Sequence, residues 1–136
     1  MHLYFSDREN AFLKSEERVL AHSDNPAALG RNIIRELVRG PQKRLTRTIP
    51  KETVLRALFI TQAGTAYVDL TAAVGKTHPG GVESELITIY SIVNSLILNV
   101  PDIKTVKILV EGHDAVTLAG HIDLQFPFKA NMLLIR

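Results

Sequence analysis

The spacing of apolar and polar residues along the chain predicts two amphipathic helices. Apolar side chains recur every three or four residues in Pro26–Arg39 and in Val82–Leu98. The first helix is preceded by the cap-forming run Ser23–Asn25 and is followed by Gly40-Pro41, which is typical of a helix end. The second is apolar at so many positions that we expect it to be largely buried.

Strands are predicted where short runs of aliphatic, aromatic and β-branched residues lie between turn residues. Thr61–Gly64 joins two of these runs as a β-hairpin, in which Gly64 supplies a positive φ. A helix is the competing interpretation for Phe12–Ala21, and Thr71–Gly81 is predicted to be a loop. The predicted strands are His2–Ser6, Phe12–Ala21, Thr53–Ile60, Thr65–Leu70 and Val106–Val110, with weaker candidates at Val116–Leu118 and Met132–Ile135.

The order of these elements, ββαββαββ, predicts an α+β fold. Hairpins alternating with two amphipathic helices favour one mainly antiparallel sheet with both helices packed on one face. The length of 136 residues matches a single domain, residues 1–136, since domains commonly have about 100–150 residues. A chain of this size buries enough surface to fold without a disulfide or a metal.

Composition excludes several classes of protein. Apolar residues make up 46% and charged residues 22% of the chain, which is globular and not disordered. Cysteine is absent, which excludes thiolate metal sites, disulfides and cysteine nucleophiles. The most apolar segment, Val82–Leu98, contains too many polar residues to span a membrane. No signal peptide is recognisable after Met1, so we expect either a cytosolic protein or a mature fragment without its leader.

Positive charge is concentrated in Arg31–Arg47, which holds six basic residues and the single acid Glu36. On the first predicted helix, arginines recur every four residues on the side opposite the apolar one. Arginine offers forked donors to phosphates and carboxylates, although an ordinary solvated helix face is the simpler interpretation. The candidate basic surface consists of Arg31, Arg35, Arg39, Lys43, Arg44 and Arg47.

Catalytic motifs are weak or incomplete. Gly75-Lys76-Thr77 resembles the end of a phosphate-binding loop, but Leu70 stands where that loop needs its first glycine. A Gly-x-Ser-x-Gly elbow is missing. Glu83 and Glu85 point about 200° apart on a helix, so helix-start acids are the favoured interpretation. Asp69 lies in a predicted strand and is a candidate to anchor a neighbouring backbone group.

One dense group of histidine and aspartate residues follows the last strong strand. Two imidazoles and a carboxylate could hold zinc or iron, but their spacing does not fix a ligand geometry. Polar residues at turns and strand ends are the favoured interpretation, and we expect no cofactor. The weak metal candidates are His113, Asp114, His121 and Asp123.

Several landmarks occur in an order that resembles the GerM domain, the sporulation and spore-germination domain of bacterial envelope proteins. The resemblance covers roughly residues 1–125. Its landmarks are Leu3–Phe5, Ile34–Leu37 before Gly40-Pro41, Ile49-Pro50, Tyr67–Leu70, Gly80-Gly81 before Glu83 and Glu85, Ile89–Leu96, and Val106–Gly112.

The resemblance implies an extracytoplasmic domain, in the periplasm or cell envelope, similar to the ring-building α+β domains of sporulation assemblies. It implies a link to peptidoglycan, the spore cortex and germination, and it carries over no catalytic residue. The implied partners are envelope proteins, peptidoglycan or further copies of the chain. Contact with a membrane is expected only through an upstream anchor, and contact with nucleic acid is not expected.

These observations predict a non-enzymatic binding or assembly module of the bacterial cell envelope. Two alternatives belong to other classes. The first is a metal-dependent or other hydrolase acting near His113 and His121. The second is a cytosolic nucleic-acid binder that uses the ridge of Arg31, Arg35 and Arg39, which would show steep salt dependence.

Overall fold

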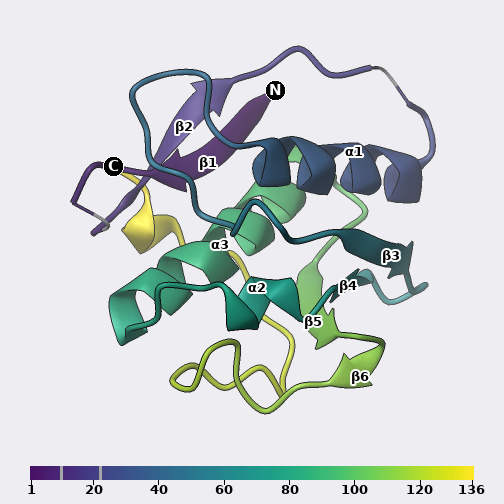
Figure 1. Cartoon of the computed structure of the whole chain (residues 1–136). Coiled ribbons are helices and arrows are strands. Elements are labelled where there is room, and N and C mark those ends of the chain that lie inside the picture. Colours follow the sequence, from purple (N-terminus) through teal and green to yellow (C-terminus); the bar gives the residue numbers. More distant parts are fainter. Residues whose placement is uncertain (10, 22) are drawn as a thin grey trace.

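A computed structural model describes residues 1–9, 11–21 and 23–136 of the chain and confirms the predicted α+β class (Figure 1). Both long helices lie where the apolar periodicity predicts them, the second ending one residue later than expected. The elements are β1 (His2–Ser6), β2 (Leu13–Glu17), α1 (Pro26–Arg39), β3 (Leu55–Ile60), β4 (Thr65–Leu70), α2 (Ala73–Lys76), α3 (Val82–Asn99), β5 (Thr105–Val110), β6 (His113–Asp114) and a 3₁₀ turn, η1 (Met132–Leu134).

The strands form two sheets, so the prediction of a single sheet is wrong. The antiparallel pair β1–β2 is one sheet, and the other has the order β3-β4-β5-β6. In the larger sheet β4 and β5 run parallel, while the other neighbours are antiparallel. The parallel pair arises because α2 and α3 carry the chain back across the sheet before β5 begins, as a helical crossover does.

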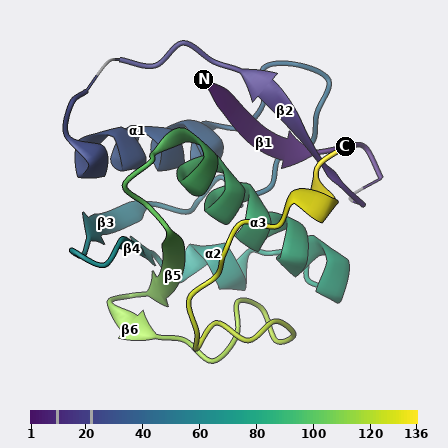
Figure 2. The same ribbon diagram turned by 180° about the vertical axis from the view of Figure 1, so that it is seen from behind.

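Helix α3 runs through the middle of the molecule, with the β1–β2 hairpin at one side and the four-stranded sheet at the other (Figures 1 and 2). It packs against β1, α1 and β5. Its apolar residues Ile89, Ile92 and Leu96 are fully buried, and they share one core with Ile33 of α1 and Val68 of β4. Each such side chain contributes about 1.5–3 kcal/mol by leaving water.

The ends of α1 are fixed by the residues that predicted them. The side chain of Asn25 accepts hydrogen bonds from the backbone N–H groups of Ala27 and Ala28, at 2.9 and 3.1 Å. Gly40 adopts a φ of 96° at the other end, and its N–H donates to the carbonyls of Glu36 and Leu37. Both features follow ordinary capping chemistry.

A row of polar side chains on α3 completes the outer edge of β1. Tyr4 is central, since its N–H donates to Ser95 Oγ at 3.1 Å and its carbonyl accepts from Ser91 Oγ at 2.6 Å. One turn further on, Asn99 donates to the carbonyl of His2 at 2.6 Å. On the side away from β2, Ser6 bonds the backbone of Thr46, and along the rest of β1 these helix side chains take the place of a third strand. We call Ser91, Ser95 and Asn99 the polar row of α3.

Other buried polar residues of α3 hold segments that have no sheet partner. Asn94 makes two hydrogen bonds of 2.9 Å with the backbone of Asn131, one as donor and one as acceptor. Thr88 donates to the carbonyl of Thr48 at 2.5 Å. The helix therefore organises both an early and a late irregular segment of the chain.

Four weaker predictions differ from the structure. The second strand is shorter than Phe12–Ala21: its last paired residue is Glu17, opposite His2, and the N–H of Arg18 donates to the carbonyl of Met1 at 2.8 Å just beyond it. Val116–Leu118 forms no strand beyond an isolated bridge at Thr117, and Met132–Ile135 is largely the 3₁₀ turn. The predicted loop Thr71–Gly81 contains α2.

Gly75 explains why α2 fits where it does. A Cβ atom at this position would lie 2.3 Å from the carbonyl oxygen of Leu118, which is closer than any side chain tolerates. The glycine allows the chain around Leu118 to pass directly over α2. The segment Gly75–Thr77 is therefore a packed helical turn, and the incomplete phosphate-loop motif has a structural explanation.

The polar row predicts an unequal effect of two serine-to-alanine substitutions in α3. Ser95→Ala leaves the N–H of Tyr4 buried without a partner, and we expect it to lower the free energy of unfolding by about 1–3 kcal/mol. Ser84→Ala, on the same helix, should change it by less than about 0.5 kcal/mol, because the Ser84 hydroxyl makes no hydrogen bond within the described chain. Urea denaturation of both variants measures the difference, and equal values would contradict the role given to Ser95.

Candidate functional site

The six predicted basic residues do not form one continuous ridge. Arg31 lies toward β3 and donates to the carbonyl of Leu58 at 3.5 Å. Arg47 folds over the end of α1, where it bonds the carbonyls of Val38 and Arg39, the latter at 2.8 Å. Arg47 thus satisfies carbonyls that the last turn of a helix leaves open, and its positive charge complements the helix dipole there.

The remaining four cations are exposed, and we call them the basic face: Arg35, Arg39, Lys43 and Arg44. Arg35 and Arg39 lie on α1 beside the segment that follows β2, while Lys43 and Arg44 lie beside β2 itself. Arg39 pairs with Glu36 at 3.3 Å, with its side chain 76% exposed. Surface ion pairs of this kind contribute little stability.

A buried ionic network lies beneath the basic face and was missed at the sequence level. Arg18 donates to Glu16 at 2.7 Å, to Glu36 at 3.1 Å and to the carbonyl of Gly40 at 2.5 Å. Glu16 also accepts the backbone N–H groups of Gln42 and Lys43. Burial raises the pKa of Glu16, but these backbone bonds and the Arg18 guanidinium outweigh it, so the pKa lies below its usual value. The network fixes the turn that carries Lys43 and Arg44.

Three of the four histidine and aspartate candidates for a metal site bond other groups of the domain. Asp114 pairs with Lys107 at 3.0 Å, and Asp123 accepts the N–H of Gln125 at 2.8 Å. His121 bonds Glu85, whereas His113 is exposed on β6. Among residues 1–9, 11–21 and 23–136, no three His, Asp or Glu side chains converge as metal ligands.

Glu85 is fully buried although it lies in the first turn of α3. Its carboxylate accepts the backbone N–H groups of Ala119, His121 and Ile122 and also contacts the ring of His121. Burial by itself raises the pKa of Glu85. These hydrogen bonds have the larger, opposite effect, so the pKa lies below its ordinary value. The burial of Glu85 could have been predicted from the sequence, because at helical spacing it continues the row of Ile89, Ile92 and Leu96. Asp69 acts similarly, as predicted, by accepting the N–H of Gly112 at 2.8 Å.

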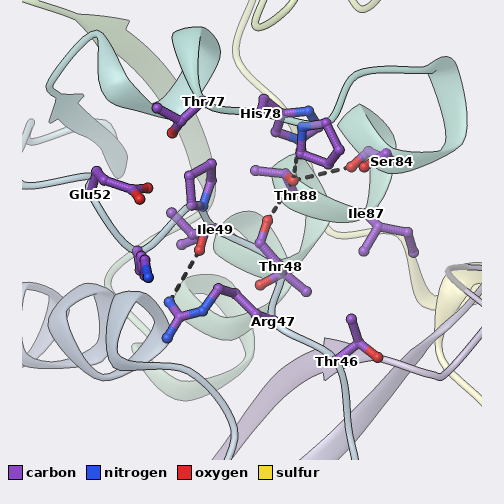
Figure 3. A pocket seen from close by; sticks show the side chains of 13 residues that line it. Thr46, Arg47, Thr48, Ile49, Glu52, Thr77, His78, Ser84, Ile87 and Thr88 are labelled. Atoms are coloured by element: carbon purple, nitrogen blue, oxygen red, sulfur yellow. Dashed lines mark hydrogen bonds between the residues drawn. The ribbon is translucent and has the colours of Figure 1, made fainter.

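A polar pocket of about 340 Å³ lies where the connection 46–52 meets the start of α3 (Figure 3). His78, Ser84 and Thr88 line one wall, and Arg47 and Glu52 lie across from them. In this pocket, the side chains of Lys51 and Glu52 and the hydroxyl of Ser84 make no hydrogen bond or ion pair within the described chain. The pocket can therefore accept a small polar group, but no pair of its side chains is arranged as a nucleophile and its base.

Both ring nitrogens of His78 are occupied. Its Nδ1 accepts the N–H of Gly80 at 2.9 Å, which assigns the proton to Nε2, and Nε2 lies 2.8 Å from Thr88 Oγ1. Burial lowers the pKa of His78 below its ordinary value of 6.5, although Glu85 and the Ser84 backbone partly oppose the shift. The imidazole is thus a structural clamp on the loop before α3, in its neutral form.

Helices α1 and α3 with the two sheets define a small α+β domain, and its described residues form no recognisable catalytic centre. Residues 2–116 match the Germane family, whose description is sporulation and spore germination. The chain belongs to this family, which confirms the resemblance seen in its ordered landmarks.

Solved structures with the same fold come from two bacteria. A Clostridium perfringens protein described as a lipoprotein is 25% identical, with 95% of this chain and 85% of that chain covered and a TM-score of 0.71. The first GerMN domain of the sporulation protein GerM from Bacillus subtilis is 18% identical, with 97% and 96% covered and a TM-score of 0.74. The tandem GerMN domains of that protein are also 18% identical, with 96% and 44% covered and a TM-score of 0.69. No curated protein matches the chain, and none of the described helices is long and apolar enough to cross a membrane.

The His78 clamp predicts a pH dependence of stability with a definite sign. Because the folded protein holds the pKa below that of the unfolded chain, the unfolded chain binds a proton first as the pH falls below 6.5. The stabilisation from neutral His78 is therefore complete above 6.5 and is lost as the pH decreases toward the folded-state pKa. Urea denaturation between about pH 5 and 7.5 should show a smaller decline for His78→Gln than for the wild type. Parallel declines would contradict the clamp.

Proposed function

We propose that this chain is a non-enzymatic binding module of the bacterial cell envelope, and that it docks through its basic face onto an anionic envelope component. Peptidoglycan with its attached polymers, or an acidic envelope protein, has the required carboxylates and phosphates. Arginine forks and lysine ammonium groups bind such groups with charge-assisted hydrogen bonds.

The observation that carries this proposal is that three of the four cations of the basic face are unpaired within the described chain. The side chains of Arg35, Lys43 and Arg44 make no ion pair or hydrogen bond within the described parts of the chain. Glu16 pairs with Arg18, and Glu36 is shared between Arg18 and Arg39. An exposed group of like charges attracts polyanions over about 10 Å at 0.1 M salt.

The location of the module is supported by the relatives. One is described as a lipoprotein and another as a sporulation protein, and both descriptions fit proteins of the envelope. A role in sporulation or germination follows from the family description, and a contribution to an assembly there is consistent with a domain that presents charged and strand-edge surfaces. The proposal is thus an extracytoplasmic binding partner in such an assembly.

Charge reversal on the basic face tests the proposal directly. We expect Arg35→Glu/Arg39→Glu to reduce co-sedimentation with isolated peptidoglycan sacculi by at least about tenfold at low salt, because attraction becomes repulsion. Arg31 and Arg47 are left in place, because Arg31 lies outside the basic face at β3 and Arg47 bonds the carbonyls at the end of α1. Sacculi with and without their attached anionic polymers distinguish phosphate from carboxylate recognition.

The matched control is Lys76→Glu/Lys129→Glu, which changes the net charge equally at two other exposed positions. It should retain most of the binding, and urea denaturation confirms that both variants are folded. Equal losses in the two variants would mean that net charge, and not the basic face, determines binding. A wild type that does not sediment with sacculi would refute the peptidoglycan form of the proposal.

A further inference from the structure

Strand β3 forms an edge of the larger sheet, and its outer backbone groups lack partners. The N–H of Thr61 donates to the carbonyl of Thr65 at 3.0 Å, which fixes Phe59 as a residue whose backbone faces β4. The backbone groups of Leu58 and Ile60 therefore point away from the sheet. Within the described chain, the N–H of Leu58 and both groups of Ile60 have no hydrogen-bond partner.

The other strand edges are covered or protected. The outer edge of β5 pairs with β6 and with Phe128, and that of β1 pairs with the polar row of α3. The outer edge of β2 is bridged by Ile135 at Leu13, and its sequence LKSEE is mostly charged or polar, which discourages pairing with another chain. By contrast β3, LRALFI, has one charged residue, and Phe59 is 51% exposed.

A groove of about 580 Å³ runs along this open edge. One wall is the start of α1, from Asn25 to Arg31, and the other is β3 from Leu58 to Ile60 with the turn that follows. The guanidinium of Arg31 lies at the groove, 3.5 Å from the carbonyl of Leu58, which is at the long limit of a hydrogen bond. A backbone N–H of an added strand could donate to the Leu58 carbonyl in place of Arg31. The guanidinium of Arg31 would then be available to bind an anion.

We infer that β3 binds an extended segment of a partner protein as an added strand. The backbone of that segment would pair with Leu58 and Ile60, and its side chains would alternate between two surroundings. On the α1 side an acidic residue would meet Arg31. On the opposite side an apolar residue would pack beside Phe59, which already stacks on Tyr67 with ring centroids 5.0 Å apart. The recognised segment is therefore an extended peptide of alternating acidic and apolar residues.

Charge complementarity distinguishes this occupant from a second copy of the chain. If two β3 strands paired antiparallel, residues around Phe59 would meet their own copies, and both Arg31 side chains would lie in the same groove. Like charges brought together in this way disfavour the pairing. A foreign acidic strand meets no such penalty.

This edge is a different surface from the basic face, so either proposal can fail while the other stands. The test begins with a displayed library of random eight-residue peptides, selected on the whole wild-type chain. We expect enriched peptides to alternate acidic and apolar residues. They should bind Arg31→Glu at least about tenfold more weakly, and a selection on that variant should favour basic residues instead. Lys129→Glu, the same change of charge at an exposed position outside both proposed surfaces, is the matched control and should bind the same peptides normally.

Two measurements identify the mode of binding without altering the protein. N-methylation of the peptide at successive amides should abolish binding at every second position, because only alternate N–H groups of an added strand face β3. Hydrogen exchange of the Leu58 and Ile60 amides should slow on peptide binding, while that of Phe59 stays protected throughout.

Several results would overturn the inference. They are the absence of any enriched peptide, N-methylation effects without alternation, or unchanged exchange at Leu58 and Ile60 in the peptide complex. Self-association of the wild type that protects these same amides would also overturn it, because it would make a second copy the occupant of the edge.

Discussion

The hydrogen bonds from the polar row of α3 to the backbone of β1 are the constraint on which the architecture depends. A two-stranded hairpin is marginal alone, since its outer backbone groups lose water when the hairpin packs on a core. Ser91, Ser95 and Asn99 supply the missing donors and acceptors at helical spacing. The hairpin can therefore lie against a helix as if against a third strand, and this allows α3 to stand between two separate sheets.

Three acidic residues act in an analogous way on the irregular segments. Glu16, Asp69 and Glu85 each accept backbone N–H groups from a turn that is distant in sequence. Unpaired N–H groups in these turns would be costly to bury, and a carboxylate can accept several of them at once. Most buried ionisable side chains of the domain thus serve its framework. What remains for recognition lies at the surface, in the basic face and the open edge of β3.

The sequence was informative where a single periodicity determined the structure. The helices, the capping residues of α1, the hairpin turn at Gly64 and the anchoring role of Asp69 follow from local patterns that the structure confirms. The division into two sheets does not follow from local patterns, because it depends on whether hydroxyls of α3 or another strand complete the outer edge of β1. A buried serine in a helix looks the same in either case. Glu85 was read as a helix-start acid for a similar reason, since its partners lie more than 30 residues away.

The candidate site shows the same limit. The sequence placed six cations in one region, but only contacts reveal that Arg47 caps α1 and that Arg31 lies toward β3. The open edge of β3 was not predictable from a list of side chains, because an unpaired backbone group depends on which strands become neighbours.

The contacts between β1 and α3 join residues 87–97 positions apart in the chain. Strand β1 therefore cannot make these hydrogen bonds before α3, which ends at Asn99, has formed. Closing so long a loop delays the contact. During synthesis the N-terminal hairpin has no route to its final hydrogen bonds until most of the chain exists. The docking of β1 on α3 is therefore expected to be a late step in the folding of the domain.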